Sequence, residues 1–123
     1  MSTGLENTSG YKTFQATSTA IPPYTRVKVD SGGLISAAAA ADTAVGVTME
    51  QVAAGGCGTV KLFSAAGSFL MTASGAIAAG TQVFPAAAGK IAGTGTTALN
   101  YQNLEAATAN GDAIECVRIE KGA

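Results

Sequence analysis

The feature that most constrains this chain is a segment that it contains twice. Residues 20–36 read AIPPYTRVKVDSGGLIS and residues 76–92 read AIAAGTQVFPAAAGKIA, at a constant offset of 56 residues and without a gap. A repeat of this kind predicts a fold built from two similar halves. The identical pairs are Ala20 and Ala76, Ile21 and Ile77, Thr25 and Thr81, Val27 and Val83, Gly33 and Gly89, and Ile35 and Ile91.

The correspondence extends beyond the two copies. Each half is predicted to hold a hairpin opened by glycine, then a strand, a Gly-rich turn and a closing strand, so that two half-barrels result. The expected matches are Val45 with Tyr101, Met49 near Leu104, residues 53–55 with 109–111 and, after one slipped residue, residues 60–62 with 117–119.

Short β-prone segments separated by turn residues indicate an all-β domain. Residues 25–30 alternate, with Val27 and Val29 on one face and Arg26 and Lys28 on the other, which is the pattern of a half-buried strand. We predict a small β-barrel or β-sandwich-like domain of about ten short strands over residues 11–123. The expected strands cover residues 11–17, 25–30, 43–50, 58–63, 67–72, 81–84, 90–92, 99–106 and 113–120.

Two segments need separate interpretation. Residues 1–10, MSTGLENTSG, contain Leu5 as a lone large apolar residue besides the initial Met, and they predict a flexible N-terminal arm. The five alanines of residues 37–41 favour a helix by propensity alone. Their counterpart, GTGTT at residues 93–97, is incompatible with a helix, so a loop or ragged strand is expected in both halves.

Composition excludes several classes of partner. Only 12% of the 123 residues are charged and the net charge is −1, so no basic stripe can neutralise nucleic-acid phosphates or bind an anionic membrane. The chain shows neither a secretory signal nor a long apolar run, and we expect synthesis in the cytoplasm without an anchor of its own. Because alanine supplies much of its apolar content, the core is expected to be thin and self-association is favoured.

The chain lacks the residues that most enzymes use. It has no histidine, which removes the commonest general base and the commonest transition-metal ligand. The eight carboxylates are dispersed and predict a solvated surface, and no cofactor or metal site is expected. Cys57 and Cys116 are interpreted as buried apolar side chains, with a disulfide between them as the alternative. Met49 and Met71 are both predicted to fill the core.

Four blocks of sequence, in this order, resemble a known family. The blocks are TSTAIPPYTRVKVDSGGLISAAAAADTAVGVTM, VAAGGCGTVKLF, SGAIAAGTQVFPAAAGKIAGTGT and ATANGDAIECVRI. Together they are similar to the capsid cement, or head decoration, proteins of tailed bacteriophages, over residues 12–119. Their motifs are spacings of Ala, Gly and Val around turns.

The resemblance implies a virion protein without catalytic activity. Such a protein forms a homotrimer on the outer surface of the head, between capsomers of the major capsid protein, and holds the shell against packaged DNA. The N-terminal segment of such proteins often reaches the shell or a neighbouring subunit. In this chain it maps to residues 1–17, so Leu5, Tyr11, Lys12 and Phe14 are the candidate binding residues.

Two other functions compete with this one. Another virion or surface module, such as a tail, fibre or surface-layer subunit, would use the same thin core and neutral surface. An enzyme is the least favoured alternative, because neither a thiol nor a carboxylate lies in a recognisable catalytic arrangement.

Overall fold

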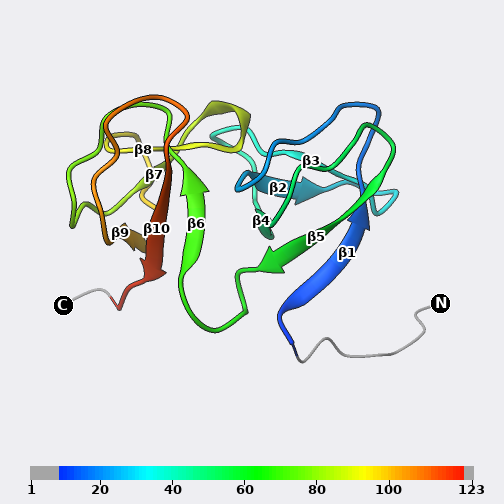
Figure 1. Ribbon diagram of the computed structural model, residues 1–123, viewed down its shortest axis with the longest axis horizontal. Helices are drawn as coiled ribbons and strands as arrows, with labels where there is room; N and C mark the ends of the chain where they lie inside the picture. The colour runs from blue at the N-terminus through cyan, green and yellow to red at the C-terminus, as the bar shows by residue number, and fades with distance from the viewer. Residues whose placement is uncertain (1–8, 121–123) are drawn as a thin grey trace.

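The chain has the predicted all-β fold, in a computed structural model that describes residues 9–120 (Figure 1). Its strands form sheets of five, three and two strands. Within the described residues these sheets lie in two lobes side by side rather than in one closed barrel. The elements are β1 (Tyr11–Gln15), β2 (Arg26–Val29), β3 (Ile35–Ala37), β4 (Gly46–Thr48), β5 (Cys57–Leu62), β6 (Phe69–Thr72), β7 (Phe84–Pro85), the 3-10 turn η1 (Ala87–Gly89), β8 (Ile91–Ala92), β9 (Tyr101–Asn103) and β10 (Ala113–Arg118).

The two lobes have the same strand order. In the N lobe, residues 9–63, the order is β1-β5-β4-β2-β3. In the C lobe, residues 67–120, it is β6-β10-β9, followed by β7-β8. A bridge between Gln82 and Gln102 links the segment before β7 to β9, which completes the series. Every strand of one lobe therefore has a counterpart in the other.

Backbone hydrogen bonds repeat from lobe to lobe and confirm the predicted duplication. Ile21 and Val52 exchange two bonds of 2.8 and 2.9 Å, and their counterparts Ile77 and Ala107 exchange two of 3.0 and 2.9 Å. Four further backbone bonds, each written from the N–H donor to the carbonyl acceptor, recur in both lobes. In the N lobe they are Ala16 to Gly56, Asp30 to Leu34, Thr48 to Thr25 and Met49 to Thr59. In the C lobe the matching bonds, in the same order, are Ala73 to Asp112, Ala86 to Lys90, Asn103 to Thr81 and Leu104 to Glu115.

A buried polar side chain has the same role in each lobe. Thr48 Oγ1 accepts a 3.0 Å bond from the Thr25 N–H and donates to the Pro22 carbonyl at 2.8 Å. Asn103 Oδ1 accepts a 2.7 Å bond from the Thr81 N–H, while its Nδ2 donates to the Ala78 carbonyl at 2.9 Å. Different residues thus satisfy the same two backbone groups, at positions 25 and 22 and, 56 residues later, at 81 and 78.

The predicted register is wrong by one residue in two strands. Strand pairing aligns Thr48 with Val60 and Asn103 with Cys116, so Val60 corresponds to Cys116 rather than to Val117. By the same pairing, Gly46 rather than Val45 corresponds to Tyr101. The cause is a one-residue deletion after β8, because Tyr101 follows Ile91 by ten positions whereas Gly46 follows the matched Ile35 by eleven. The offset returns to 56 before β10, so the slip that the sequence suggested at residue 60 is absent.

Each lobe has its own hydrophobic core. The N-lobe cluster contains aliphatic and alanine side chains: Ala16, Ile21, Val27, Ile35, Val52 and Val60. The C-lobe cluster is larger and includes the aromatic residues Phe69 and Tyr101. It also takes in Val47 and Ala65 from outside that lobe, so the larger core continues across the lobe contact.

Several local predictions are corrected. Met71 is buried as predicted, but Met49 is exposed, because it follows β4 at the point where the chain turns outward. Cys116 is buried as predicted, whereas Cys57 is exposed at the start of β5, where this strand pairs with β1. Both thiols are free, so the alternative of a disulfide between them is wrong.

The alanine segment is non-helical, which confirms the prediction of a loop or ragged strand. Ala37 ends β3, and the residues after Ala38 form a turn in which the Asp42 N–H donates to the Ala39 carbonyl. The predicted strand over residues 99–106 shortens to Tyr101–Asn103, since the flanking residues form loops that carry the repeated hydrogen bonds.

Candidate functional site

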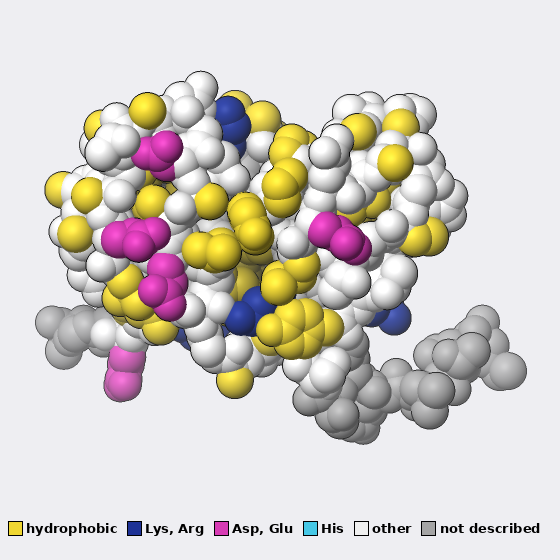
Figure 2. All heavy atoms as spheres, viewed as in Figure 1, with side chains coloured by type: hydrophobic (Ala, Val, Ile, Leu, Met, Phe, Trp, Pro, Cys, Tyr) yellow, Lys and Arg dark blue, Asp and Glu magenta, His cyan; other side chains and the backbone are white. Residues whose placement is uncertain are grey.

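A hollow on the surface lies between the two lobes. It has a volume of about 420 Å³. Figure 2 shows apolar side chains gathered in this hollow, with acidic groups along its rim. We refer to it as the interlobe cleft; it is lined by Tyr24, Val47, Met49 and Lys61 of the N lobe and by Ser68, Phe69, Leu70, Glu105 and Glu115 of the C lobe.

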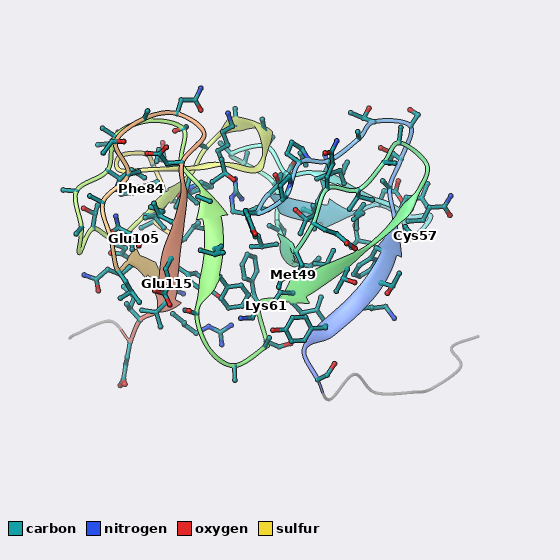
Figure 3. All side chains as sticks on the ribbon, viewed as in Figure 1. Met49, Cys57, Lys61, Phe84, Glu105 and Glu115 are labelled. Carbon is teal, nitrogen blue, oxygen red and sulfur yellow. The ribbon has the colours of Figure 1, made fainter. Side chains whose placement is uncertain are left out.

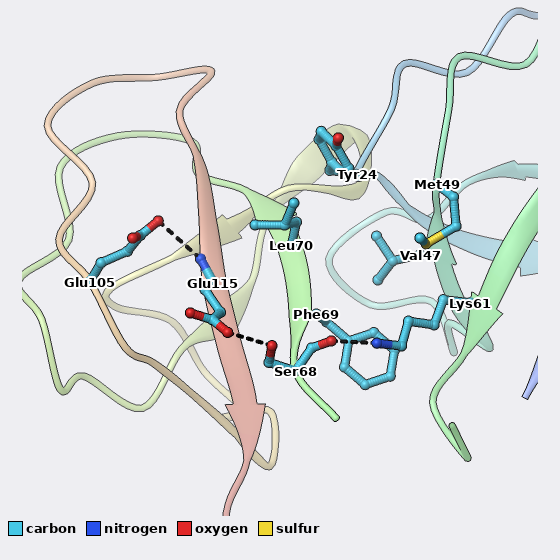
Figure 4. Close-up of a pocket in the computed structure, with 9 residues that line it drawn as sticks. All are labelled: Tyr24, Val47, Met49, Lys61, Ser68, Phe69, Leu70, Glu105 and Glu115. Carbon is cyan, nitrogen blue, oxygen red and sulfur yellow. Dashed lines mark hydrogen bonds between the residues drawn. The ribbon is translucent and has the colours of Figure 1, made fainter. Parts of the chain in front are cut away.

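Lys61 links the two walls of the interlobe cleft (Figure 4). Its Nζ donates to the carbonyl of Ser68 and lies 4.5 Å from the centre of the Phe69 ring, a cation–π contact. The Ser68 hydroxyl donates to Glu115 Oε2 at 2.5 Å, and the Glu115 N–H donates to Glu105 Oε1 at 3.2 Å. One hydrogen-bonded chain therefore runs from the N lobe to both acidic side chains.

The acidic wall affects the neighbouring thiol. Burial, and to a lesser extent the negative charges of Glu105 and Glu115, together raise the pKa of Cys116 to about 12. Since the thiolate is the reactive form, Cys116 is an inert packing residue at neutral pH. Figure 3 places Cys57 at the outer edge of the N lobe, well away from Glu105 and Glu115 of the C lobe.

A second set of contacts, behind the interlobe cleft, joins the lobes through Arg26. This side chain is 1% exposed, and burial lowers its pKa. Its Nε donates to the Lys90 carbonyl at 3.1 Å and its Nη2 to the Ala86 carbonyl at 2.9 Å. The Gly89 N–H also donates to the Ala38 carbonyl at 2.7 Å. The β7–β8 hairpin of the C lobe is thereby fixed against β2 of the N lobe.

Aromatic packing closes the same contact. Phe63 of the N lobe lies 5.6 Å from Phe69 and 5.3 Å from Tyr101, measured between ring centres. Phe69 and Tyr101 meet edge to face at 5.5 Å. Such pairs stabilise a contact by about 1 kcal/mol beyond the area that they bury. Together with Arg26, these aromatic pairs fix the position of one lobe relative to the other.

The predicted binding residues that the structure describes begin beside the interlobe cleft, where Lys61 Nζ lies 5.9 Å from the centre of the Tyr11 ring. Tyr11 and Lys12 are exposed on the edge strand β1. Phe14 is partly buried against the N-lobe core, so it anchors β1 as well as facing outward, and Lys12 Nζ lies 5.9 Å from its ring centre. Leu5 lies outside the described residues. The structure therefore brings three of the four together on one strand.

Backbone groups of β1 also face outward. The Gly10 carbonyl accepts a bond from Leu62, and the Ala16 N–H donates to Gly56, so even-numbered residues of this segment face β5. Because antiparallel strands alternate, the backbone of Thr13 faces the open edge, whereas the end of β1 meets β3 through a parallel bridge between Ala16 and Ile35. An open edge of this kind can accept a further strand.

Sequence reasoning missed the residues of the interlobe cleft. Met49 was expected in the core, and Glu105 and Glu115 were expected to be dispersed on the surface. The signal available in the sequence was the repeat itself, because Met49 and Leu104 are matched apolar residues at the ends of matched strands. Only the packing of one lobe on the other shows that Leu70 faces Met49 across a cleft (Figure 4).

The described residues carry no recognisable metal centre. Among residues 9–120, no three His, Cys, Asp or Glu side chains gather closely enough to hold an ion. Asp112 instead accepts hydrogen bonds from the N–H groups of Thr108 and Ala109 and from the Thr108 hydroxyl, and these bonds lower its pKa. No helix in this part of the chain has the length and apolar character needed to span a bilayer.

Comparison with known proteins identifies the fold. No protein-family profile matches the chain, and no curated protein sequence matches it. Among solved structures, the chain is similar to the head fibre gp8.5 N base of bacteriophage phi29, with a TM-score of 0.72 and 18% sequence identity. The match covers 90% of this chain and 99% of that one. The two proteins therefore share a fold over nearly their whole lengths.

Proposed function

We propose that this chain is a structural protein of a tailed-phage virion that decorates the outside of the head. In this proposal it binds as a homotrimer over contacts between capsomers of the major capsid protein and stabilises the shell. It uses no cofactor and does not contact nucleic acid or membrane. The observation that carries the proposal is the shared fold with a phage head fibre base over nearly the whole chain.

The surface supports a role in binding rather than in chemistry. It combines an open edge strand, β1, with exposed large apolar side chains and few charges. A partner can add main-chain hydrogen bonds to such an edge with little dependence on sequence. If three arms of a trimer act together, weak single contacts give tight retention through a high effective concentration.

Co-sedimentation with phage heads that lack the chain tests this proposal. The full chain should sediment with intact heads in a saturable manner, and heads carrying it should resist heating and osmotic shock better than bare heads. A chain without residues 1–8, which include Leu5, should fold normally by circular dichroism and dissociate faster. Absence of binding to heads would overturn the proposal, whereas unchanged dissociation of the shortened chain would remove the arm from it.

A second candidate follows from the same comparison. The similar structure is the base of a head fibre, so this chain could instead anchor a projecting fibre to the head. Negative-stain images of decorated heads distinguish the two roles. Low, evenly spaced density favours decoration, while thin projections above each attachment point favour a fibre base.

A further inference from the structure

We propose that copies of this chain associate head to tail, through a contact that repeats between molecules the contact joining the two lobes within one. The proposal deepens the self-association suggested above and rests on it. It assigns the open β1 edge to a neighbouring copy of the same chain. The existing lobe contact defines the form that the contact between copies would take.

The lobe contact uses a different face of each lobe. The N lobe contributes what we term its forward face, with the Tyr24 carbonyl and the Arg26 side chain. The C lobe contributes its rear face, with the β6 edge and the β7–β8 hairpin. The Thr72 N–H donates to the Tyr24 carbonyl at 3.0 Å, and the Thr72 hydroxyl donates to the same oxygen at 3.0 Å. Because the lobes are equivalent, each must carry a second, unused face.

The unused rear face of the N lobe is open to solvent. Gln15 is the counterpart of Thr72 and lies exposed at the end of β1. Gly33, the counterpart of Gly89, has nothing within 4 Å of where a Cβ would stand. By contrast, a Cβ on Gly89 would lie 2.6 Å from the Arg26 carbonyl oxygen, because the other lobe covers it. The same hairpin is therefore covered in one lobe and bare in the other.

The unused forward face of the C lobe is the counterpart of the Tyr24 loop. Gly80 and Ala79 correspond to Tyr24 and Pro23, and both are exposed. In Figure 1, β9 lies at the end of the C lobe away from the N lobe, and β1 lies at the opposite end of the molecule. The two unused faces are thus at opposite ends, where one molecule can meet the next without obstructing its own lobe contact.

The exposed large apolar side chains mark these same faces. Met49 and Leu70, 41% and 42% exposed, line the interlobe cleft. Leu104, the counterpart of Met49, is 53% exposed on the forward face of the C lobe. Val29, 38% exposed, is the counterpart of Pro85, which lies beside Arg26 and Phe63 at the lobe contact. Tyr11, 41% exposed, is the counterpart of the cleft residue Ser68.

Every large apolar side chain that stands out in the described residues is accounted for in this way. Each lies either at the existing contact or at the face that would repeat it. Apolar groups gathered on particular faces commonly mark surfaces that another molecule covers. In the repeated contact, Leu104 of one copy would face Thr13 of the next, the counterpart of Leu70, across a second cleft that Tyr11 would also line.

The directions of matched strands indicate that successive lobes are rotated relative to one another. In Figure 1, β6 and its counterpart β1 point in clearly different directions, so one lobe is rotated relative to the other. A head-to-tail contact that rotates at every step can close into a ring. Three copies would then form a ring of six similar lobes, which agrees with the proposed trimer.

The contact between copies should be weaker than the contact within one. Arg26 corresponds to Gln82, which carries no charge and donates its Nε2 to the Leu99 carbonyl at 3.0 Å. The repeated contact therefore lacks the buried guanidinium that fixes the β7–β8 hairpin. We expect association to depend on protein concentration and to be strengthened on the shell.

Cysteine cross-linking tests the contact directly. In a Cys57→Ser background, Gln15→Cys and Ala79→Cys replace the counterparts of Thr72 and Pro23, which touch at the lobe contact, with 3.5 Å between the Thr72 hydroxyl and the Pro23 carbonyl oxygen. The Cys57→Ser change is needed because Gln15 is paired with Cys57 across β1 and β5. The double variant is oxidised with copper phenanthroline at high protein concentration and separated on a denaturing gel without reductant.

The expected result is a ladder that ends at three linked chains. Each single variant alone should remain a monomer, while a mixture of the two single variants should stop at two chains. Failure of the double variant to cross-link would overturn the proposal, as would equal cross-linking of a single variant with itself, which indicates a symmetric contact. A trimer by sedimentation without this cross-link would overturn the head-to-tail contact and leave the proposed function intact.

Matched charge substitutions provide a second test without engineered thiols. Leu104→Asp should shift the concentration dependence of association at least tenfold toward monomer in analytical ultracentrifugation. Met49→Asp is the control, since it changes the counterpart residue in the interlobe cleft and should leave association unchanged. Both residues are exposed, so circular dichroism should show both variants folded. Equal effects of the two variants, or none, would contradict the proposal.

Discussion

The N and C lobes share one backbone framework and differ in what they pack against it. Val60 in β5 corresponds to Cys116 in β10, and Gly46 corresponds to Tyr101. Where the N lobe has glycine, the C lobe has an aromatic ring that meets Phe63 from the other lobe. The repeated hydrogen bonds therefore fix the fold, while the side chains at matched positions decide which face of each lobe is covered.

The difference also shows why the molecule has two lobes rather than two domains that fold apart. The N-lobe core is small and contains no aromatic residue among its buried members. The C-lobe core extends into the lobe contact through Val47 and Ala65. Burial of apolar area across that contact adds to both lobes, since each Å² removed from water contributes about 25 cal/mol. Variants at matched positions can separate these contributions.

The largest difference is expected at the pair Arg26 and Gln82. Arg26→Ala leaves the Ala86 carbonyl without its side-chain donor, takes one of two donors from the Lys90 carbonyl and opens a void at the lobe contact, at a cost of about 3 to 4 kcal/mol. Gln82→Ala loses one bond to the Leu99 carbonyl and should cost about 1 kcal/mol. Urea unfolding measures both; equal losses would show that the lobe contact contributes little.

The next difference concerns two glycines. Gly89 and Gly33 both have positive φ, 71° and 81°, so alanine strains either by about 1 kcal/mol. At Gly89 the new methyl also overlaps Thr25 and the Arg26 carbonyl, which should raise the total to about 3 kcal/mol. Thermal unfolding of Gly89→Ala and Gly33→Ala should separate them, and a Gly33→Ala variant as unstable as Gly89→Ala would contradict the comparison.

A third test exchanges residues between lobes. Asn103→Ala removes the oxygen that accepts from the Thr81 N–H and the amide nitrogen that donates to the Ala78 and Glu105 carbonyls. The expected cost is about 2 to 3 kcal/mol. Asn103→Thr introduces the residue that has this role in the N lobe, and it should recover about 1 kcal/mol. Chemical denaturation decides the matter: threonine no better than alanine would mean that the two sites are not equivalent.

The smallest effect is expected above pH 9. The pKa of Cys116 is raised by burial and then by Glu105 and Glu115, from its usual 9.0 to about 12. Between these values the unfolded chain releases a thiol proton that the folded chain keeps, so the free energy of unfolding falls as pH rises. Cys116→Val introduces the N-lobe counterpart Val60 and should lose less stability between pH 8 and 10.5. Identical pH profiles would contradict the shifted pKa.

Much of the fold was predictable because it depends on local signals. The repeat at residues 20–36 and 76–92, the Gly33 turn and the alternation in β2 are all legible from adjacent residues. The alanine segment was correctly predicted as non-helical because its counterpart is rich in glycine and threonine. Register was predicted less well, since a one-residue deletion in a loop leaves no mark in a chain rich in Ala and Gly.

The interlobe cleft could not be predicted, because it depends on how one lobe packs on the other. Nothing in the sequence distinguishes Met49 from a core methionine or Arg26 from the surface residue that strand alternation suggests. Arg26 is buried only because the Ala86 and Lys90 carbonyls of the other lobe satisfy its guanidinium. The predicted arm residue Leu5 lies outside the described residues and stays a prediction.

Cryo-electron microscopy of phage heads assembled with and without this chain tests the central claim most directly. Additional density is expected on the outer surface of the shell, between capsomers, and three copies of the two-lobed chain should fit into it with β1 of each beside the C lobe of the next. Heads that show the same outer surface with and without the chain would contradict it.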